Sequence, residues 1–341
     1  MNTLSSSSTT VPVSALVQAR RWLLQLFLRL GVLPFMLAGA VVVFATLSDQ
    51  FLTSQNLLNL LRQSVYLVLV SLGQMLALIT GGFDLAVGTT IAMTSVVSAM
   101  VMVALPELSP FWAIAIGCAA GLGAALVIGA INGIGIAYAG VSPFIMTLGV
   151  QSIGFGLALY LTGGVPVSGL PGGFSDTFGF GTLLGLPVPV LITVMMALAL
   201  YLVMTRTAIG THLMAVGGNA KAAYLSGINA RHMLLLAYMI CALMAAIAGL
   251  LLTARVESGE ANLGGTIALE SIAACVIAGV SLRGGTGRVE NVVLGAIFIG
   301  LVQNGMNLAN VGSYMQMVVL GLLLIVAVIA DALRYRLSIP S

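Results

Sequence analysis

The sequence LLNLLRQSVYLVLVSLGQMLALI (57–79), TGGFDLAVG (80–88) and TTIAMTSVVSAMVMVA (89–104) consists of two apolar runs on either side of a short polar break. Continuous apolar runs of this length indicate helices that cross a lipid bilayer, whereas the strands of a membrane barrel would alternate. The break contains two glycines and Asp84. It should not face lipid, because its backbone polar groups must be satisfied by protein or by a water-filled cavity.

The whole chain has the composition of a polytopic membrane protein. Of its 341 residues, 60% are hydrophobic and 6% are charged, and its mean hydropathy is +1.15. A soluble domain carries about 25% charged residues. Twelve basic and nine acidic side chains could not cover a soluble protein of this length, so soluble enzymes are excluded. The basic residues are dispersed, which excludes a nucleic-acid partner.

Three cysteines lie in apolar stretches without the spacing of metal ligands: Cys118, Cys241 and Cys275. We interpret them as small packing residues, and we expect neither a metal site nor a disulfide.

Ten apolar runs predict an all-α membrane protein with about ten crossings. They cover 31–48, 57–79, 89–104, 111–137, 141–161, 187–205, 232–254, 266–282, 291–309 and 314–331. The eighth run is the weakest, because Glu270 leaves too few uncharged residues for a full crossing, and it is interpreted as a broken or partly re-entrant helix.

Basic residues predict the orientation of these helices, because they are enriched in cytoplasmic loops. With the N-terminus inside, ten of the twelve fall on the inner side: Arg20, Arg21, Arg29, Arg206, Lys221, Arg231, Arg283, Arg288, Arg334 and Arg336. The sequence therefore predicts a cytoplasmic tail (1–30), a transmembrane domain (31–331) with an inner loop at 206–231, and a second cytoplasmic tail (332–341).

The two halves of the chain resemble each other. GTTIAMTSVV from Gly88 aligns with GGTIALESIA from Gly264, and GAALVIGAING from Gly123 aligns with GAIFIGLVQNG from Gly295. These matches pair the third run with the eighth and the fourth with the ninth. With five crossings in each half, the paired runs cross in opposite directions, which predicts two inverted five-helix halves of the kind found in transporters.

Polar residues at the breaks are the first candidates for function. Asp84 either caps the helix that follows it or contacts substrate. Glu257 and Glu260 lie in a predicted outer loop, which is either simply solvated or docks an external partner.

Amides inside the apolar runs need partners, because an unpaired polar group is costly in lipid. Asn132, Gln303, Asn304 and Asn307 are such amides, and Asn304 and Asn307 share one helical face. They either form hydrogen bonds between helices or line a pathway.

The inner loop from Arg206 to Arg231 is long, basic and comparatively polar. Gly217-Gly218-Asn219 predicts a turn in which Asn219 caps a short helix that ends at Gly227. Such a helix would offer a rigid projection to a partner. His212 and His232 flank the loop without a second ligand at metal spacing, and we interpret them as interfacial side chains.

Two kinds of energy source are excluded by the sequence. It contains no GxxxxGK[ST] motif, so the chain cannot cradle the phosphates of ATP. It also lacks the series of intramembrane acids and histidines that proton-driven carriers use.

Five motifs resemble one protein family in their order along the chain. They are TGGFDLAVG (80–88), SPFIMTLGV (142–150), AVGGNAKAAYLSGIN (215–229), LESIAACVIAGVSLRGGTG (269–287) and GLVQNGMNL (300–308). They are similar to motifs of the ribose/xylose/arabinose/galactose-type sugar ABC importer permeases, within the branched-chain-type permease superfamily. The likeness runs from about residue 50 to residue 331. Phe83 and Ala86 stand where the family usually has Ile and Ser, and Ser271 where it usually has Asp.

This resemblance implies a BtuC-like permease subunit in the bacterial inner membrane. It implies a second permease copy, a periplasmic sugar-binding protein outside and ATPase subunits inside, which hold ATP and Mg while this chain binds no cofactor. The chain itself is then no enzyme and has no catalytic residues. The helix within 215–229 is implied to couple to the ATPase.

Three groups of residues follow as expected sites. The expected ATPase-coupling residues are Gly217, Gly218, Asn219, Ala222, Ser226 and Gly227. The expected docking residues for the binding protein are Glu257 and Glu260. The expected substrate pathway comprises Asp84, Asn132, Phe144, Thr147, Asn304 and Asn307.

The predicted function is passage of a monosaccharide delivered by the binding protein. A permease for branched-chain amino acids or nucleosides is the nearest alternative. From other classes, a stand-alone ion-driven carrier and a scaffolding membrane protein remain alternatives.

Overall fold

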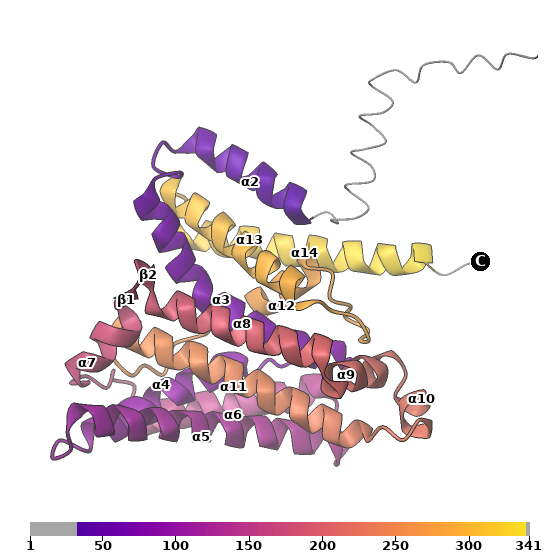
Figure 1. Cartoon of the computed structure of the whole chain (residues 1–341), viewed down its shortest axis with the longest axis horizontal. Helices are drawn as coiled ribbons and strands as arrows, with labels where there is room; N and C mark the ends of the chain where they lie inside the picture. Colours follow the sequence, from indigo (N-terminus) through magenta and orange to yellow (C-terminus); the bar gives the residue numbers. More distant parts are fainter. Residues whose placement is uncertain (1–32, 339–341) are drawn as a thin grey trace, which may run out of the picture.

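The computed structural model of the chain describes residues 33–338 and is mainly helical within them (Figure 1). Each predicted apolar run contains one helix. These ten helices are α2 (Leu33–Leu47), α3 (Ser54–Ile79), α4 (Val87–Val103), α5 (Pro110–Ala137), α6 (Pro143–Thr162), α8 (Val188–Arg206), α11 (Ala230–Val256), α12 (Ile267–Ile277), α13 (Val289–Leu308) and α14 (Ser313–Ser338). The arginines at 20, 21 and 29 lie outside the described residues, as do the side chains of Arg334 and Arg336.

Short elements occupy two of the connections between these helices. The connection from α6 to α8 contains α7 (Gly172–Phe174), the π-helical turn η1 (Ser175–Gly179) and a hairpin of β1 (Thr182–Leu183) and β2 (Leu186–Pro187). The hairpin is antiparallel, with Leu183 opposite Leu186. The connection from α8 to α11 forms α9 (Ala208–Gly218) and α10 (Ala220–Leu225).

Local chemistry fixes several helix ends. α5 and α6 begin at Pro110 and Pro143, because proline at the first helical position supplies the required φ and its missing N–H has no helical partner there. Thr53 caps α3 by accepting a hydrogen bond from the backbone of Asn56 at 3.3 Å. α6 stops at Gly163, which takes a left-handed conformation with φ of 62°.

The ten helices differ in their ability to span a membrane. Six are long and apolar enough to cross one: α3, α5, α6, α8, α11 and α13. The shorter apolar helices are α2, α4, α12 and the part of α14 up to Ile329. α12 has 11 residues and is therefore about 16 Å long, roughly half of the bilayer's hydrocarbon core. The eighth apolar run thus contains a short helix followed by a loop, as its charge pattern predicts.

The long helices α3 and α11 pack together in the middle of the molecule. A Cβ added to Gly73 of α3 would lie 2.9 Å from the Cα of Cys241 on α11, so the two backbones touch. α3 also packs against α12 and α13, whereas α11 also packs against α4 and α5. Figure 1 shows two groups of helices, with α2, α12, α13 and α14 in the upper part and α4, α5 and α6, packed around α11, in the lower part.

The pattern of neighbours is the same in both groups. α4 packs against α5 and α6, and α12 packs against α13 and α14. Exchanging α3 with α11, α4 with α12, α5 with α13 and α6 with α14 therefore leaves these neighbour relations unchanged.

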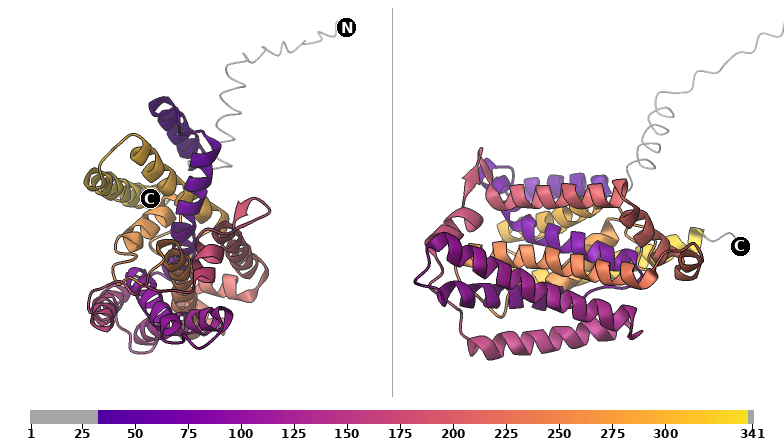
Figure 2. Two further views of the ribbon diagram at one scale, coloured as in Figure 1. Left: turned by 90° about the vertical axis from the view of Figure 1, so that its left-hand side faces the viewer. Right: turned by 60° about the horizontal axis from the view of Figure 1, so that its bottom comes forward.

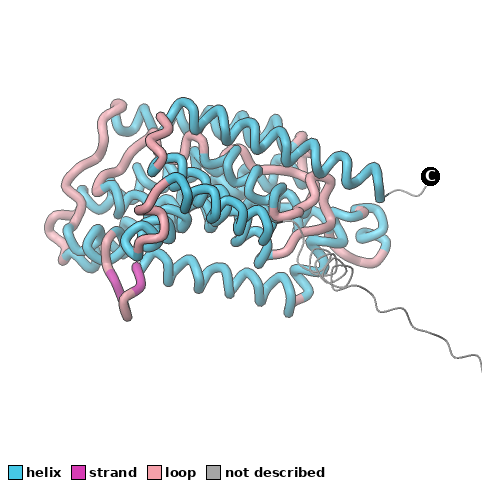
Figure 3. Tube along the Cα trace, turned by 90° about the horizontal axis from the view of Figure 1, so that it is seen from above, coloured by secondary structure: helices cyan, strands magenta, loops and turns pink. Residues whose placement is uncertain are grey.

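Loops and short elements gather at two opposite ends of the helix bundle (Figures 2 and 3). α9 and α10 lie at one end, and we call it the α10 end. The β1–β2 hairpin lies at the opposite end (Figure 2). The final helix continues to Ser338, so the segment predicted as the second tail, 332–341, begins as helix.

Candidate functional site

The polar break at Thr80–Ala86 forms a tightly packed turn between α3 and α4. Gly81 has φ of 85°, a conformation that favours glycine. A Cβ on Gly82 would lie 2.5 Å from the hydroxyl oxygen of Tyr238 on α11 and 3.0 Å from Pro143 on α6. The break is therefore enclosed by protein, as expected for irregular backbone between membrane helices.

Asp84 is fully buried in this turn and is held by three helices. Its Oδ1 accepts hydrogen bonds from the Ala86 amide at 2.8 Å, at the start of α4, and from the Asn132 side chain of α5 at 3.4 Å. When the Gln74 side-chain amide of α3 is oriented so that its donor faces an acceptor, it donates a hydrogen bond to the Asp84 carbonyl and accepts one from the Asp84 amide, each at 3.1 Å. Asp84 is therefore not the N-cap of α4, which is Ala86 and has no side-chain cap. Asp84 instead closes the turn before the helix by accepting from the amide two residues on, and Gln74 is the further residue that fixes this turn.

Two buried oxygen atoms beside this turn lack a strong hydrogen-bond donor. Among the residues that the structure describes, Oδ2 of Asp84 has no partner apart from the thiol of Cys241, which is a weak donor. Within the same residues, Oδ1 of Asn132 has no partner either. Both side chains are fully buried, so the two acceptors are an unsatisfied polar pair.

One face of α6 connects this turn to a pocket. Phe144, Thr147, Gln151 and Phe155 follow one another at spacings of three and four residues, so they share one side of the helix. We call this set the α6 stripe. The Phe144 ring is half exposed and contacts the Phe83 ring edge to face, with centroids 6.1 Å apart. Thr147 is buried and donates to the Pro143 carbonyl at 2.8 Å.

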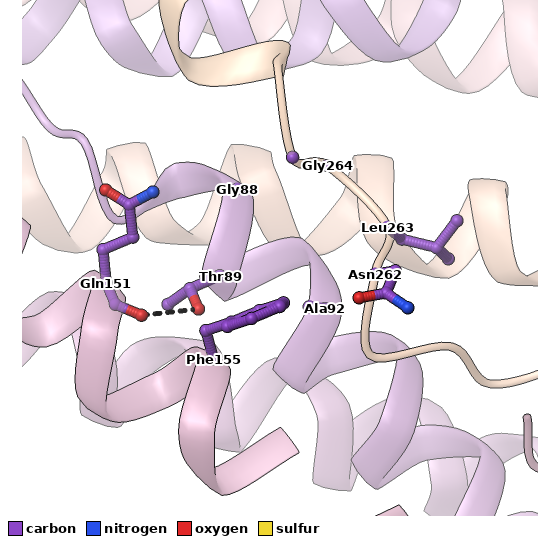
Figure 4. Close-up of a pocket in the computed structure, with 9 residues that line it drawn as sticks. Gly88, Thr89, Ala92, Gln151, Phe155, Asn262, Leu263 and Gly264 are labelled. Carbon is purple, nitrogen blue, oxygen red and sulfur yellow. Dashed lines mark hydrogen bonds between the residues drawn. The ribbon is translucent and has the colours of Figure 1, made fainter. Parts of the chain in front are cut away.

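The pocket lies between α4, α6 and the segment before α12, and it encloses about 240 Å³ (Figure 4). Thr89 closes one wall by donating to the backbone oxygen of Gln151 at 3.1 Å. Figure 4 shows the Phe155 ring extending from α6 into the space between Thr89 and Asn262. The lining residues are Gly88, Thr89, Ala92, Gln151, Phe155, Asn262, Leu263, Gly264 and Gly265.

The chemistry of the pocket is neutral and mixed. Its side chains offer one aromatic ring, two amides and a hydroxyl, and none of the nine lining residues is charged. These side chains can place an aromatic face against C–H groups of a ligand, and they can both donate hydrogen bonds to its hydroxyl groups and accept hydrogen bonds from them.

Two residues of the expected pathway lie elsewhere, near the opposite end from α10. Asn304 of α13 exchanges a reciprocal pair of hydrogen bonds with Asn56 in the first turn of α3, both at 3.0 Å. Asn307 is exposed and accepts a hydrogen bond from Gln316 of α14 at 2.7 Å. This geometry favours the interpretation of both amides as bonds between helices. The structure does not bring them together with Asp84.

The segment 206–231 folds as the sequence indicates. The Asn219 side chain accepts a hydrogen bond from the Ala222 amide at 3.0 Å and caps α10, which confirms the predicted cap. The helix ends at Leu225, and Gly227 follows with φ of 83°.

The surface of α10 carries a pair of large apolar side chains. Tyr224 is 73% exposed and Leu225 is 77% exposed, while Ala223 is buried beneath them. Ala222 and Ser226 are also exposed. Gly217 differs from these residues, because it packs inward against the end of α3.

Exposed basic side chains surround α10. Five of the seven basic residues whose side chains are described lie on the segments of this end: Arg206, Lys221, Arg231, Arg283 and Arg288. Five of the eight acidic residues whose side chains are described occupy connections toward the opposite end: Asp49, Glu107, Asp176, Glu257 and Glu260. Glu290, in the first turn of α13, is an exposed acid at the α10 end. His232 packs its ring against Tyr138, with centroids 6.5 Å apart.

The expected docking residues sit in a loop fixed to the rest of the protein. Glu257 is exposed and has φ of 59° at the end of α11. Glu260 accepts a hydrogen bond from Ser258 at 3.0 Å, and its backbone amide donates to Ser95 of α4 at 3.1 Å. Gly259 pairs with Val167, which ties the loop to the segment after α6.

Sequence reasoning missed Gln74, Gln151, Phe155 and Asn262. The two glutamines carried the same signal as Asn132, an amide within an apolar run, and that criterion would have found them. Phe155 and Asn262 carried no such signal, because an aromatic ring in an apolar run and an amide in a loop are both ordinary.

Comparisons with known proteins agree with one another. The model of the family described as "Branched-chain amino acid transport system / permease component" matches residues 56–328. No solved structure matches the chain.

Curated relatives cover nearly the whole chain. The D-allose transport system permease protein of Escherichia coli K12 is 37% identical over 300 residues, covering 88% of this chain and 90% of that protein. The ribose import permease protein of Bacillus subtilis is 37% identical over 292 residues, covering 85% and 89%. The galactose/methyl galactoside import permease protein of Escherichia coli K12 is 36% identical over 313 residues, covering 87% and 91%.

Proposed function

Because the chain belongs to the branched-chain amino acid transport system / permease component family, we propose that it is the permease subunit of an ABC importer for a monosaccharide. The observation that carries this proposal is its similarity, over most of both chains, to permeases named for allose, ribose and galactose. The family description names branched-chain amino acids, so the choice of a sugar rests on these relatives. Amino acid and nucleoside substrates are correspondingly disfavoured.

The energy for transport comes from a partner ATPase in this proposal. The sequence has no phosphate-cradling motif of its own. The chain is therefore not an enzyme, and ATP with Mg binds to the partner. A periplasmic sugar-binding protein and a second permease copy complete the complex.

We propose ten crossings arranged as two inverted halves, in a BtuC-like architecture. The exchangeable neighbour relations of α3–α6 and α11–α14 support the two halves. A second support is the contact between Gly88 and Gly264, which the sequence repeat pairs with each other. A Cβ on Gly88 would lie 2.5 Å from the Gly264 oxygen, and one on Gly264 would lie 2.8 Å from the Gly88 oxygen. Residues that are equivalent in two halves of a molecule contact each other close to the twofold axis that relates the halves.

The α10 end faces the cytoplasm of a bacterial cell in this proposal, with both chain termini on that side. The five exposed basic residues at this end support the orientation, because Lys and Arg are enriched in cytoplasmic loops. α10 then docks on the ATPase through Tyr224 and Leu225, and Glu257 and Glu260 face the binding protein.

In this proposal the sugar path runs between α4 and α6, beginning at the pocket that they line. It passes the α6 stripe and reaches the turn that holds Asp84 and Asn132. The neutral side chains of the pocket suit a polyol, and their modest number suits a ligand that must leave again. The unpaired oxygen atoms of Asp84 and Asn132 are acceptors for sugar hydroxyl groups once the two helix groups reorient.

Reconstitution tests this function directly. The permease, its ATPase and its binding protein are placed in liposomes, and uptake of labelled D-ribose, D-allose and D-galactose is measured with and without ATP. We expect uptake of one of these sugars that requires ATP and the binding protein. Uptake by the permease alone, abolished by a protonophore, would instead identify an ion-driven carrier.

A further inference from the structure

Three chain segments meet through their backbones at the α10 end. They are the end of α3 with Ile79, the end of α9 with Gly217 and Gly218, and the loop between α12 and α13 with Gly284 and Gly285. The Gly285 amide donates a hydrogen bond to the Ile79 carbonyl at 2.8 Å. We call this contact the glycine junction.

Side chains are excluded from the junction by its geometry. A Cβ on Gly217 would overlap the carbonyl oxygen of Ile79. One on Gly284 would lie 2.7 Å from the Gly217 oxygen and 2.9 Å from the Ile79 oxygen, and one on Gly285 would lie 2.9 Å from the Cα of Gly218. Real Cβ contacts are longer than 3.0 Å, so each of these positions requires glycine.

The loop that completes the junction has a fixed shape. Gly284 and Gly285 take φ of 90° and 80°, which favour glycine. The Ser281 amide donates to the Thr286 carbonyl at 3.1 Å and the Gly284 amide donates to Ser281 at 3.1 Å, which closes the loop on itself. Backbone contacts of this kind have no rotamers through which they can relax, so displacement of one segment pushes the next.

The junction connects the surface of α10 to the buried turn. Asn219, the cap of α10, follows directly after Gly217 and Gly218. On the other side, Ile79 directly precedes the turn with Gly81 and Asp84, and Gln74 on the same helix bonds the Asp84 backbone. Gly284 and Gly285 lie in the loop that follows α12, so the junction is also connected to α12, the helix that the sequence repeat pairs with α4.

We propose that the glycine junction makes α9–α10, the end of α3 and the α12–α13 loop move as one body during transport. Motion of the ATPase-docking helix α10 then reaches the Asp84 turn before α4 and the helix α12 together. The inference rests on the proposed function, because it assigns a route for coupling to a partner ATPase. Its residues are positioning residues, since none of them touches the pocket.

Two helical glycines supply the test. In Gly217→Ala the new methyl group overlaps Ile79, whereas in Gly123→Ala, on the exposed side of α5, no atom lies within 4 Å of the new methyl group. Both variants are assembled with the ATPase and binding protein in liposomes, and ATPase association, ATP hydrolysis and D-ribose uptake are measured. If wild-type uptake selects D-allose or D-galactose, that sugar replaces D-ribose.

If the junction moves as one body, Gly217→Ala should change sugar uptake without changing ATPase association. We expect Gly217→Ala to associate with the ATPase as the wild type does, because the exposed face of α10 is unchanged. Its ATP-driven uptake should fall by about tenfold or more, a typical size for a coupling effect, while Gly123→Ala stays near wild type. Equal uptake by both variants, or loss of ATPase association in Gly217→Ala, would overturn the proposed role of the glycine junction.

Hydrogen exchange of the wild-type complex tests the junction without a substitution that can impair folding. The Gly285 amide should stay protected both without nucleotide and with a trapped ATP state, because the junction does not open. Exchange as fast as that of an unstructured peptide in either state would overturn the proposal. Failure of the proposed function is a separate outcome, since the wild-type complex would then show no ATP-dependent sugar uptake.

Discussion

At the scale of single residues, Gln74 determines whether the turn between α3 and α4 keeps its shape. Its amide bonds the backbone N–H and C=O of Asp84, both at 3.1 Å, in a region without exposure to solvent. The backbone N–H and C=O of Asp84 are therefore hydrogen-bonded by a side chain, as the backbone of a neighbouring strand would bond them in a sheet. The Asp84 side chain in turn accepts a hydrogen bond from the Ala86 amide, directly before α4.

Substitution of Gln74 should therefore destabilise the protein without changing its apolar packing. We expect Gln74→Leu to lower the free energy of unfolding by about 1–3 kcal/mol, because it leaves two buried backbone groups without partners. Gln63→Leu on the same helix is the control, since Gln63 is exposed. Equilibrium unfolding in mixed detergent micelles measures both, and equal stability of the two variants would show that Gln74 does not hold the turn.

The sequence shows which residues are polar within an apolar run, but not which partner each one meets. The helix-capping interpretation of Asp84 followed from its position near a helix start, but the N-cap of α4 is Ala86. The bond between Gln74 and the Asp84 backbone, and the pair formed by Asn56 and Asn304, depend on how the chain folds back. Asn304 and Asn307 were accordingly expected on the pathway with Asp84, although they bond neighbouring helices near the other end.

At the scale of elements, α6 carries a side that faces the pocket and a side that does not. Phe155 lines the pocket, whereas Ile153 is 71% exposed and is absent from the lining. Hydropathy alone could not separate these faces, because α6 is apolar all round. Phe144 and Thr147 were expected on the pathway, but the place of Phe155 in the pocket becomes visible only once α4 lies beside α6.

Phe155→Ala should impair sugar passage while leaving assembly intact. We expect a lower rate of ATP-dependent D-ribose, D-allose or D-galactose uptake, reduced by about 5- to 30-fold, because the aromatic face is worth about 1–2 kcal/mol to a bound ring. Ile153→Ala is the matched control on the other face of the helix. Unchanged uptake by Phe155→Ala would place the path elsewhere.

α10 is the element whose shape the sequence predicts best. Asn219 and Gly227 mark its two ends, because a cap and a left-handed glycine are local features. The glycine junction behind it was not predictable, since Ile79, Gly217 and Gly285 are far apart in the sequence.

The exposed pair on α10 should supply binding energy for the ATPase. We expect the double variant Tyr224→Ala/Leu225→Ala to weaken ATPase association by about tenfold or more, because exposed apolar side chains of this size act as anchors when an interface covers them. Tyr160→Ala serves as the control, since Tyr160 is 83% exposed at the far end of α6. Pull-down of the ATPase by detergent-solubilised permease measures the difference, and equal retention would remove α10 from the docking surface.

At the scale of the whole molecule, hydropathy predicted where the ten apolar helices lie, because each apolar run contains one. It did not predict their lengths. α12 ends after 11 residues, since Gly279 and the glycine-rich loop that follows it stop the helix inside the apolar run. The structure was required to show that α3 packs with helices of the second half, α12 and α13, and that α11 packs with helices of the first half, α4 and α5. Each half thus contributes its long helix to the helix group of the other half.

The sidedness of the α10 end can be measured through Lys221, which is exposed and is the single lysine of the sequence. A membrane-impermeant amine reagent is applied to sealed spheroplasts and to inverted vesicles, and the peptide that contains Lys221 is analysed. We predict labelling in inverted vesicles alone, and protection of Lys221 when the ATPase is bound. Labelling of Lys221 in sealed spheroplasts would place α10 outside the cell and contradict its role as the contact for an ATPase.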